Sequence, residues 1–228
     1  MKALPVGPGA DELAYDPRTG LLYVNCSGGD TGKDYSLIAI VDTNSMTKLG
    51  DISLAAPSLE SSAIDSERQL LYVALDTRSA VAAVDLRKRR VVSTWTLPSG
   101  HRDTAIALDT RRGRLYVACR DSAMRGSVFV LNTTNGRSMA NLPIGGWADG
   151  IFLDQKRNRI YVSTGVGHID TYAIEPHDVY RGLPAVDTSI LGKTSLYSNA
   201  IDRMFVDVPE LYPAAHERAR VMEFRPVP

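Results

Sequence analysis

Acidic side chains recur at one position of a repeated pattern in this chain. The position lies five residues before a second recurring residue, which is an aspartate in four of the five repeats. The residues found there are Asp11, Glu60, Thr104 (next to Asp103), Asp149 and Lys193. Carboxylates gathered in a concave site can hold a hard cation through their oxygens, or a cationic group of a ligand. The alternative is that these side chains cap turns by accepting hydrogen bonds from backbone amides.

Basic side chains gather at a second set of positions, in short turns rich in Pro, Gly, Asn and Arg. The set includes Arg89, Arg90, Arg111, Arg112 and Arg157. A surface of this kind can bind the phosphates of nucleic acid or another anionic surface. No series of aromatic residues accompanies the arginines, so binding of single strands has weak support. The alternative interpretation is that these residues supply solubility and turn propensity.

The histidines and cysteines give few candidates for chemistry. No histidine has the spacing of a metal ligand, and His101 alone stands near the acidic positions, where it could act as a base. Cys26 and Cys119 occupy the same position of the first and third repeats. Because one repeat separates them, we expect two free, packed thiols rather than a disulfide.

The repeat that sets these positions is marked by an aromatic residue between two aliphatic ones. The five copies are Leu22-Tyr23-Val24, Leu71-Tyr72-Val73, Leu115-Tyr116-Val117, Ile160-Tyr161-Val162 and Met204-Phe205-Val206. A spacing of about 40–50 residues is typical of repeat folds. Seven residues before the aromatic stand Asp16, Asp65, Asp109, Asp154 and, in the fifth repeat, Ser198. The register is too regular for chance.

Each repeat predicts four short strands. The first ends in the aspartate (AIALD, 105–109), a turn follows (TRRG, 110–113), and the aromatic triplet forms the second strand. The third often ends in Asp or Asn (VAAVD, 81–85), and the fourth approaches a glycine (LPIG, 142–145). Short antiparallel strands without helical periodicity describe the WD40-like blade of an all-β protein, a β-propeller of four-stranded antiparallel blades. The aromatic and branched residues then pack one blade against the next.

The whole chain, residues 1–228, is expected to form one propeller domain. The predicted repeats are 8–54, 55–99, 100–145, 146–192 and 193–228. The fifth repeat ends before a fourth strand, and residues 2–7 (Leu4-Pro5-Val6-Gly7 at their end) have the look of one, so they are a candidate closing strand. Both a closed ring of five blades and an incomplete ring of seven fit these data.

The repeats resemble those of the YVTN-type β-propeller proteins of bacteria and archaea. Stretches such as DELAYDPRTGLLYVN (11–25) and ALDTRRGRLYVACRD (107–121) carry the resemblance over essentially the whole chain, although Thr-Asn never follows Tyr-Val here. The resemblance implies a ring usually of seven blades, often exported, with relatives of lactonase-like fold and some members tied to DNA binding. The incomplete seven-bladed ring is therefore the favoured case.

Propeller topology sorts the candidate residues onto two faces. The acidic position would surround one mouth of the central channel, and the basic turns would lie on the opposite face. Lys plus Arg equals Asp plus Glu at 26 each, so no net charge draws the chain to nucleic acid, and no apolar run is long enough to cross a membrane. The sequence as written opens without a signal peptide, which indicates a cytoplasmic protein. A chain with a longer N-terminus would instead be periplasmic or secreted.

Two functions compete at the channel mouth. The first is a non-enzymatic binding or interaction scaffold for an unknown protein or small-molecule ligand, without a cofactor. The second is a lactonase-like hydrolase in which Asp11, Glu60 and Asp149 hold a divalent cation whose bound water is the nucleophile. No catalytic signature favours the second, and the fold alone implies no activity. Nucleic-acid binding through the basic turns is a further alternative.

Overall fold

The regular elements among the residues that the structure describes are short β-strands and three single-turn 3₁₀ segments. The computed structural model describes residues 2–98, 102–210 and 218–227, and within strand β9 the side chains of 103 and 104 are not described. The 3₁₀ segments are η1 (Gly29–Thr31), η2 (Asp76–Arg78) and η3 (Pro176–Asp178). In this described part, no helix has the length and apolar character that spanning a membrane requires.

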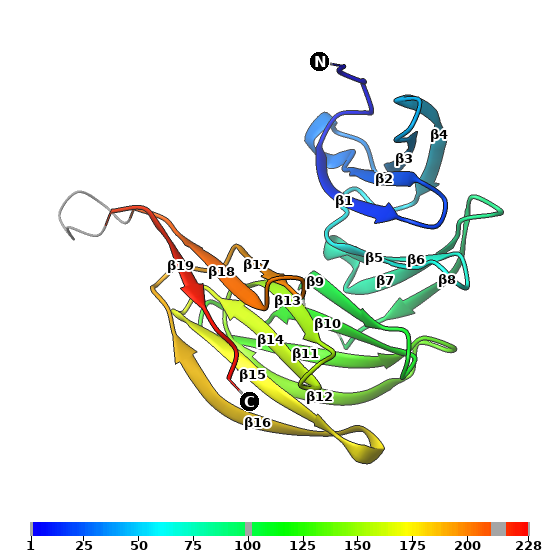
Figure 1. Cartoon of the computed structure of the whole chain (residues 1–228). Coiled ribbons are helices and arrows are strands. Elements are labelled where there is room, and N and C mark those ends of the chain that lie inside the picture. The colour runs from blue at the N-terminus through cyan, green and yellow to red at the C-terminus, as the bar shows by residue number, and fades with distance from the viewer. Residues whose placement is uncertain (1, 99–101, 211–217, 228) are drawn as a thin grey trace.

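The strands form five antiparallel sheets in chain order, the blades of a β-propeller (Figure 1). Blade 1 contains β1 (Ala10–Asp16), β2 (Leu21–Cys26), β3 (Ser36–Asp42) and β4 (Thr47–Leu54). Blade 2 contains β5 (Ser62–Asp65), β6 (Leu70–Leu75), β7 (Ala80–Asp85) and β8 (Arg90–Thr96). Blade 3 contains β9 (Arg102–Asp109), β10 (Arg114–Arg120), β11 (Arg125–Asn132) and β12 (Ser138–Gly145). Blade 4 contains β13 (Ala148–Asp154), β14 (Arg159–Thr164), β15 (His168–Glu175) and β16 (Val179–Asp187). Blade 5 contains β17 (Ser195–Ser198), β18 (Arg203–Val208) and β19 (Arg220–Phe224).

The first strands of successive blades lie against one another at the centre of the molecule. The blades follow each other in an arc around these strands, and blades 1 and 5 are the two ends of the arc (Figure 1). The predicted all-β propeller is therefore confirmed, with three strands in the fifth blade among the described residues.

A separate hydrophobic cluster fills each junction between neighbouring blades. The predicted second strands supply much of it, because sheets that pack face to face bury their central strands on both sides. Tyr23, Tyr72, Tyr116 and Tyr161 are all buried. Tyr116 meets Tyr180 of blade 4 edge-on at 6.1 Å between ring centroids, and Tyr161 meets Tyr197 of blade 5 at 5.4 Å. The repeated triplet is thus the packing unit between blades.

The repeated aspartate at the end of each first strand is buried and bonded within its own blade. Asp16, Asp109 and Asp154 are 0% exposed and Asp65 is 4% exposed. Each accepts a hydrogen bond from a backbone amide of the turn that follows it, as Asp109 does from Arg112 at 3.1 Å. Buried carboxylates need such partners, because an unpaired buried charge is costly.

Asp16 also connects its blade to the next. Asp16 accepts hydrogen bonds from Ser66 Oγ at 2.8 Å and Gln69 Nε2 at 2.9 Å, both in blade 2. Burial by itself raises the pKa of Asp16, but these bonds outweigh it and the net pKa is lowered. The carboxylate is therefore held in its charged form by residues of two blades.

In the junction between blades 4 and 5, an arginine binds an aspartate of each blade. The Arg157 side chain is only 12% exposed and bonds Asp154 of its own blade at 2.9 Å and Asp202 of blade 5 at 2.6 and 2.8 Å. Tyr161 Oη donates to Asp154 at 2.9 Å. Burial raises the pKa of Asp154, but the bonds from Arg157 and Tyr161 lower it further than burial raises it. The hydrogen bonds from Arg157 likewise lower the pKa of Asp202.

The turn residue that reaches the neighbouring blade has a left-handed backbone. This position, immediately before each second strand, is occupied by Gly20, Gln69, Gly113, Asn158 and Asp202, with φ between 51° and 70°. Asn and Asp tolerate this region better than most residues because their short side chains bond locally. Asn158 accepts from Arg112 at 2.8 Å, in the same way that Asp202 accepts from Arg157. One tight turn thus serves both the chain reversal and the contact between blades.

Two further predictions concern the cysteines and the N-terminal segment. Cys26 and Cys119 are free and buried, as predicted. The expectation that residues 2–7 close blade 5 is not met: they form no strand, and Leu4 and Val6 pack against Val24 and Cys26 on the outer face of blade 1. The reason is geometric, because blades 1 and 5 stand at opposite ends of the arc (Figure 1).

Substituting Asp154→Ala should destabilise the chain by about 3 kcal/mol, because it leaves Tyr161 Oη and part of the Arg157 guanidinium buried without a partner. Equilibrium urea unfolding measures the change in the free energy of unfolding. Asp51→Ala is the matched control, since Asp51 pairs with Lys48 at the surface, and should cost less than about 1 kcal/mol. Equal effects of the two changes would show that the buried aspartate does not hold the junction.

Candidate functional site

The candidate site lies at the channel mouth, where the fourth strand of one blade connects to the first strand of the next. Hydrogen bonds from the preceding blade fix two of the mouth residues there. Asn25 Nδ2 donates to the carbonyl of Glu60 at 2.7 Å, and Ser163 Oγ donates to the carbonyl of Lys193 at 2.5 Å. Asn25 and Ser163 each stand two residues after the aromatic of their second strand. The repeat therefore positions the backbone of the mouth and leaves the side chains to vary.

Asp149 is the centre of a charged cluster formed by blades 3, 4 and 5. Its carboxylate accepts from Arg120 at the end of β10, from Lys193 Nζ at 3.0 Å and from Thr194 Oγ1 at 3.1 Å. The Arg120 side chain is further held by a bond from Nε to the carbonyl of Ala148 at 3.0 Å. Two cations and one carboxylate thus lie together, partly open to solvent.

A second ion pair lies beside this cluster. Arg102 at the start of β9 donates from Nε and Nη2 to the two oxygens of Asp76, at 2.9 and 2.5 Å. The hydrogen bonds that Arg102 donates to this carboxylate raise the pKa of Arg102. Asp76 is buried, whereas the Arg102 side chain is 65% exposed. The pair therefore presents its positive end to the channel mouth.

These cations line a cavity of about 430 Å³. Its wall consists of Arg102, Arg120, Asp121, Ser122, Trp147 and Lys193. The cavity wall therefore carries three cations and one acid, with the carboxylates of Asp76 and Asp149 behind the cations. An anion entering it would meet guanidinium and ammonium groups before it met their counter-ions.

Trp147 gives the cavity one flat apolar side. The residue has φ 57°, a strained conformation for a bulky side chain, and is 42% exposed. Its carbonyl accepts from the amide of Gly165 at 3.1 Å, and a Cβ at Gly165 would stand 2.9 Å from the Trp147 Cβ. The glycine is therefore required for the tryptophan to lie where it does. An exposed indole in this position can stack against a planar ligand group.

Glu60 is the titratable group of the mouth whose charge changes near neutral pH. Burial, and to a lesser degree the nearby carboxylates of Asp76, Asp11 and Asp149, raise its pKa to about 7 against the opposing effect of Arg120. A strongly shifted carboxyl group in a cleft marks a candidate functional residue. At pH 6 the Glu60 side chain is mostly neutral, and at pH 8 it is mostly charged.

The mouth residues predicted from the sequence are brought together only in part. Asp149 and Lys193 are bonded to each other, and Glu60 lies within electrostatic reach of Asp149 and of the exposed Asp11 on β1. Asp103 is part of β9, but its side chain is outside the described portion, as is all of His101. Across residues 2–98, 102–210 and 218–227, no three His, Cys, Asp or Glu side chains are grouped so as to hold a metal ion.

The predicted basic face contains two arginines that are committed to the fold. Arg112 bonds Asp109 and Asn158, and Arg157 bonds Asp154 and Asp202, so both serve the blade junctions. Arg111 and Arg90 are exposed, and Arg89 Nη1 donates to the carbonyl of Leu49 at 3.2 Å. The cationic character of this face is therefore smaller than the count of arginines suggests.

The sequence-based candidates did not include several residues of the site, among them Asp76, Arg102, Arg120 and Trp147. Asp76 and Arg120 share one repeat position, four residues after Tyr72 and Tyr116 respectively, at the end of the second strand. The repeat register could have shown that both reach the mouth. Nothing in the sequence indicated that Arg102 would pair with Asp76, because the two residues belong to different blades.

No protein-family model matches the chain, and no curated protein matches it. Solved structures match its fold. The chain is similar to Kuenenia stuttgartiensis hydrazine synthase, with a TM-score of 0.78 and 14% identity over 96% of this chain and 63% of that one. It is also similar to a functionally unknown protein from Desulfotomaculum acetoxidans DSM 771, with a TM-score of 0.70 and 11% identity over 86% of this chain and 64% of that one.

These similarities establish the class of the protein, a β-propeller, and nothing narrower. The chain spans slightly less than two thirds of the length of each of the two structures. At this level of identity the fold is shared and the site residues need not be. The resemblance to YVTN-type repeats stays a prediction from the sequence.

The stability of the chain should decrease as pH rises from 5 to 8 because of Glu60. A carboxyl group whose pKa is raised in the folded state binds a proton more tightly there than in the unfolded chain, so its ionisation favours unfolding. Glu60→Gln should remove this loss, worth about 1–2 kcal/mol after solvent screening. Urea unfolding at both pH values measures it, with Glu67→Gln on the opposite face as the control. A pH dependence that is identical in wild type and Glu60→Gln would contradict the assignment.

Proposed function

We propose that this protein is a non-enzymatic binding propeller whose ligand is a small anion with a planar apolar part. The observation that carries the proposal is the cavity at the channel mouth, whose wall combines Arg102, Arg120 and Lys193 with the exposed ring of Trp147. Charge-assisted hydrogen bonds would hold the anionic group, and the indole would hold the planar part. Ligand sites commonly combine an apolar surface with a few convergent polar groups in this way.

The arrangement of charges supports binding more than catalysis. Arg102 and Arg120 stand at strand ends, and Lys193 lies two residues before β17. All three cations are bonded to Asp76 or Asp149, so less side-chain entropy is lost when an anion enters than for unbonded side chains. The lactonase-like alternative needs Asp11, Glu60 and Asp149 to converge on one cation. Asp149 is instead occupied by Arg120, Lys193 and Thr194. Nucleic-acid binding has no comparable support, because Arg112 and Arg157 are engaged in the junctions.

Isothermal titration calorimetry tests the proposal with three probes: benzoate, phenyl phosphate and the cation benzylamine. We expect the two anions to bind and benzylamine to bind much more weakly. Arg102→Met and Lys193→Met should each lower anion affinity roughly tenfold or more, since each removes one charge-assisted hydrogen bond. Lys156→Met, which removes an exposed lysine from the opposite face, should leave affinity unchanged. Failure of both anions to bind, or equal binding of benzylamine, would contradict the proposal.

Anion affinity should also fall as pH rises from 6 to 8. Glu60 acquires its negative charge in this range and opposes an anion at the mouth. The same titrations with Glu60→Gln should show a smaller decrease, because the remaining dependence comes only from the ligand and the other groups. An unchanged pH dependence in this variant would place the anion away from Glu60.

A further inference from the structure

Three exposed apolar side chains stand at the edge of the cavity at the channel mouth. Met124 is 72% exposed, Trp147 is 42% exposed and Ile190 is 62% exposed. Trp147 lines the cavity, Met124 stands two residues after the lining residue Ser122, and Ile190 stands three residues before the lining residue Lys193. Large apolar side chains that lie together on a surface mark a site of interaction.

The loops that carry these residues are packed against one another through glycines. The turn 121–124 joins β10 to β11, and the linker 146–147 joins β12 to β13. A Cβ on Gly146 would overlap the carbonyl oxygen of Ala123 and would stand 2.7 Å from the amide nitrogen of Met124. A side chain does not fit at this position, so the turn and the linker lie in direct contact.

The same packing continues towards blade 5. The turn 165–167 joins β14 to β15, and it contacts both Trp147 and the linker 188–194, which joins β16 to β17. The amide of Gly165 donates to the carbonyl of Trp147 at 3.1 Å, and the carbonyl of Gly165 accepts from the amide of Leu191 at 2.8 Å. The three apolar residues therefore stand on one continuous row of four loops.

The composition of this surface is typical of a protein-binding site. We call Met124, Trp147 and Ile190 the mouth rim, and the cations Arg102 and Lys193 line the cavity beside it. Met, Trp and Arg are enriched in protein–protein interfaces, Met because its flexible thioether adapts to the shape of a partner. The backbone contacts between the four loops also hold the rim in place. Less loop ordering is then needed on binding than for loops without such contacts.

A ligand that filled only the cavity would leave most of the mouth rim uncovered. Neither Met124 nor Ile190 is among the residues that line the cavity. A polypeptide can cover both surfaces, because one of its residues enters the cavity while the residues before it lie across the rim. Covering the rim is favourable in proportion to the apolar area removed from water.

The content of the cavity wall favours the C-terminal end of such a polypeptide. Three cations and one indole surround a space of about 430 Å³, so an anionic group and a planar group must enter it close together. Within an extended segment, neighbouring side chains point to opposite sides, which separates an acidic side chain from the aromatic one beside it. A C-terminal aromatic residue carries the ring and a carboxylate on one residue. Its negative charge also complements the three cations.

We propose that the channel mouth binds the C-terminal residue of a partner polypeptide, and that this residue is aromatic. Its free carboxylate accepts charge-assisted hydrogen bonds from Arg102 and Lys193, and its ring stacks on Trp147. The apolar residues that precede it cover Met124 and Ile190. The inference rests on the proposed function, because it names the source of the anionic and planar groups.

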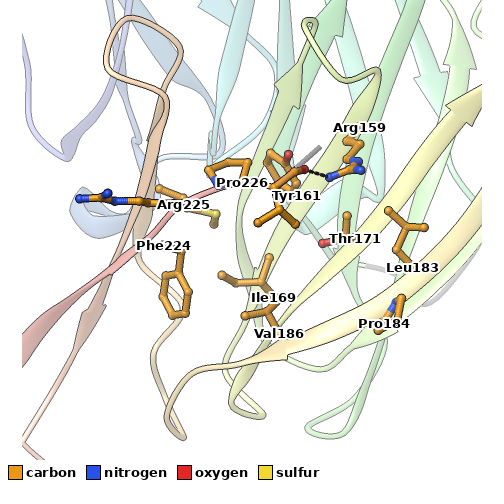
Figure 2. A pocket seen from close by; sticks show the side chains of 12 residues that line it. Arg159, Tyr161, Ile169, Thr171, Leu183, Pro184, Val186, Phe224, Arg225 and Pro226 are labelled. Carbon is orange, nitrogen blue, oxygen red and sulfur yellow. Dashed lines mark hydrogen bonds between the residues drawn. The ribbon is translucent and has the colours of Figure 1, made fainter.

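A second cavity of about 430 Å³ lies between blades 4 and 5 and provides a control (Figure 2). Ile169, Val186 and Phe224 contribute to its mainly apolar lining, and none of its described lining residues belongs to the four loops of the mouth. The apolar part of a peptide would find a competing surface there. Val186, which is 43% exposed, is therefore the control position in the experiment.

Isothermal titration calorimetry tests the proposal with two probes that share one end. N-acetylphenylalanine reaches only the cavity, whereas the peptide acetyl-Leu-Ala-Leu-Phe, with a free C-terminal carboxylate, also reaches the rim. We expect the peptide to bind roughly tenfold or more tightly than N-acetylphenylalanine, because its leucines cover the rim. The same peptide with a C-terminal amide should bind at least about tenfold more weakly than the free acid. Equal binding of acid and amide would overturn the proposal.

Substitutions at the rim separate its contribution from that of the cavity. Met124→Ser and Ile190→Ser change exposed side chains, and each should lower the affinity for the peptide roughly threefold or more. Neither should change the affinity for N-acetylphenylalanine. Val186→Ser is the matched control and should change neither affinity. An unchanged peptide affinity in the two rim variants, or an equal loss in Val186→Ser, would contradict the proposal.

Benzoate separates failure of this inference from failure of the proposed function. If benzoate and N-acetylphenylalanine bind but the peptide binds no more tightly than N-acetylphenylalanine, the inference is wrong and the anion site is retained. If neither of these two anions binds, both the inference and the proposed function are wrong.

Discussion

The buried aspartate at the end of each first strand is the charge around which neighbouring blades are joined. A carboxylate removed from water is tolerated only when several donors surround it. Here the donors come from the following turn, and they reach the adjacent blade either directly, at Asp16, or through an arginine, at Asp109 and Asp154. Asp16 depends on Gln69, and Asp154 depends on an arginine that also bonds Asp202. The aromatic clusters fill the space between the sheets, and these polar contacts fix how one sheet lies against the next.

The polar side chains have different roles on the two faces of the molecule. On the face of the turns, two of the predicted arginines, Arg112 and Arg157, bind aspartates at the blade junctions. On the other face, the repeat fixes only backbone positions, through bonds such as that of Asn25 to the carbonyl of Glu60. The side chains there are free to differ from blade to blade. That freedom allows three cations and an indole to meet in one cavity without cost to the blade packing.

The same logic explains why the ends of the arc differ from its interior. Each blade buries its two faces against two neighbours, so the first and last blades each keep one face that no blade covers. In blade 1 the N-terminal segment partly covers that face, with Leu4 and Val6 over Cys26. In blade 5 the described residues form a three-stranded sheet beside an apolar cavity.

The sequence by itself determined the blade, because the aspartate and the aromatic recur in a register that local strand and turn preferences reproduce in every repeat. It also predicted that Glu60, Asp149 and Lys193 lie at the channel mouth and that Cys26 and Cys119 form no disulfide and are packed. Only the tertiary structure decided which charges pair. These charge pairs join different blades, and no periodicity within one repeat encodes them. They are Arg102 with Asp76, and Asp149 with Arg120 and Lys193. The position of residues 2–7 was likewise decided by geometry, since a strand can join only a sheet that its chain can reach.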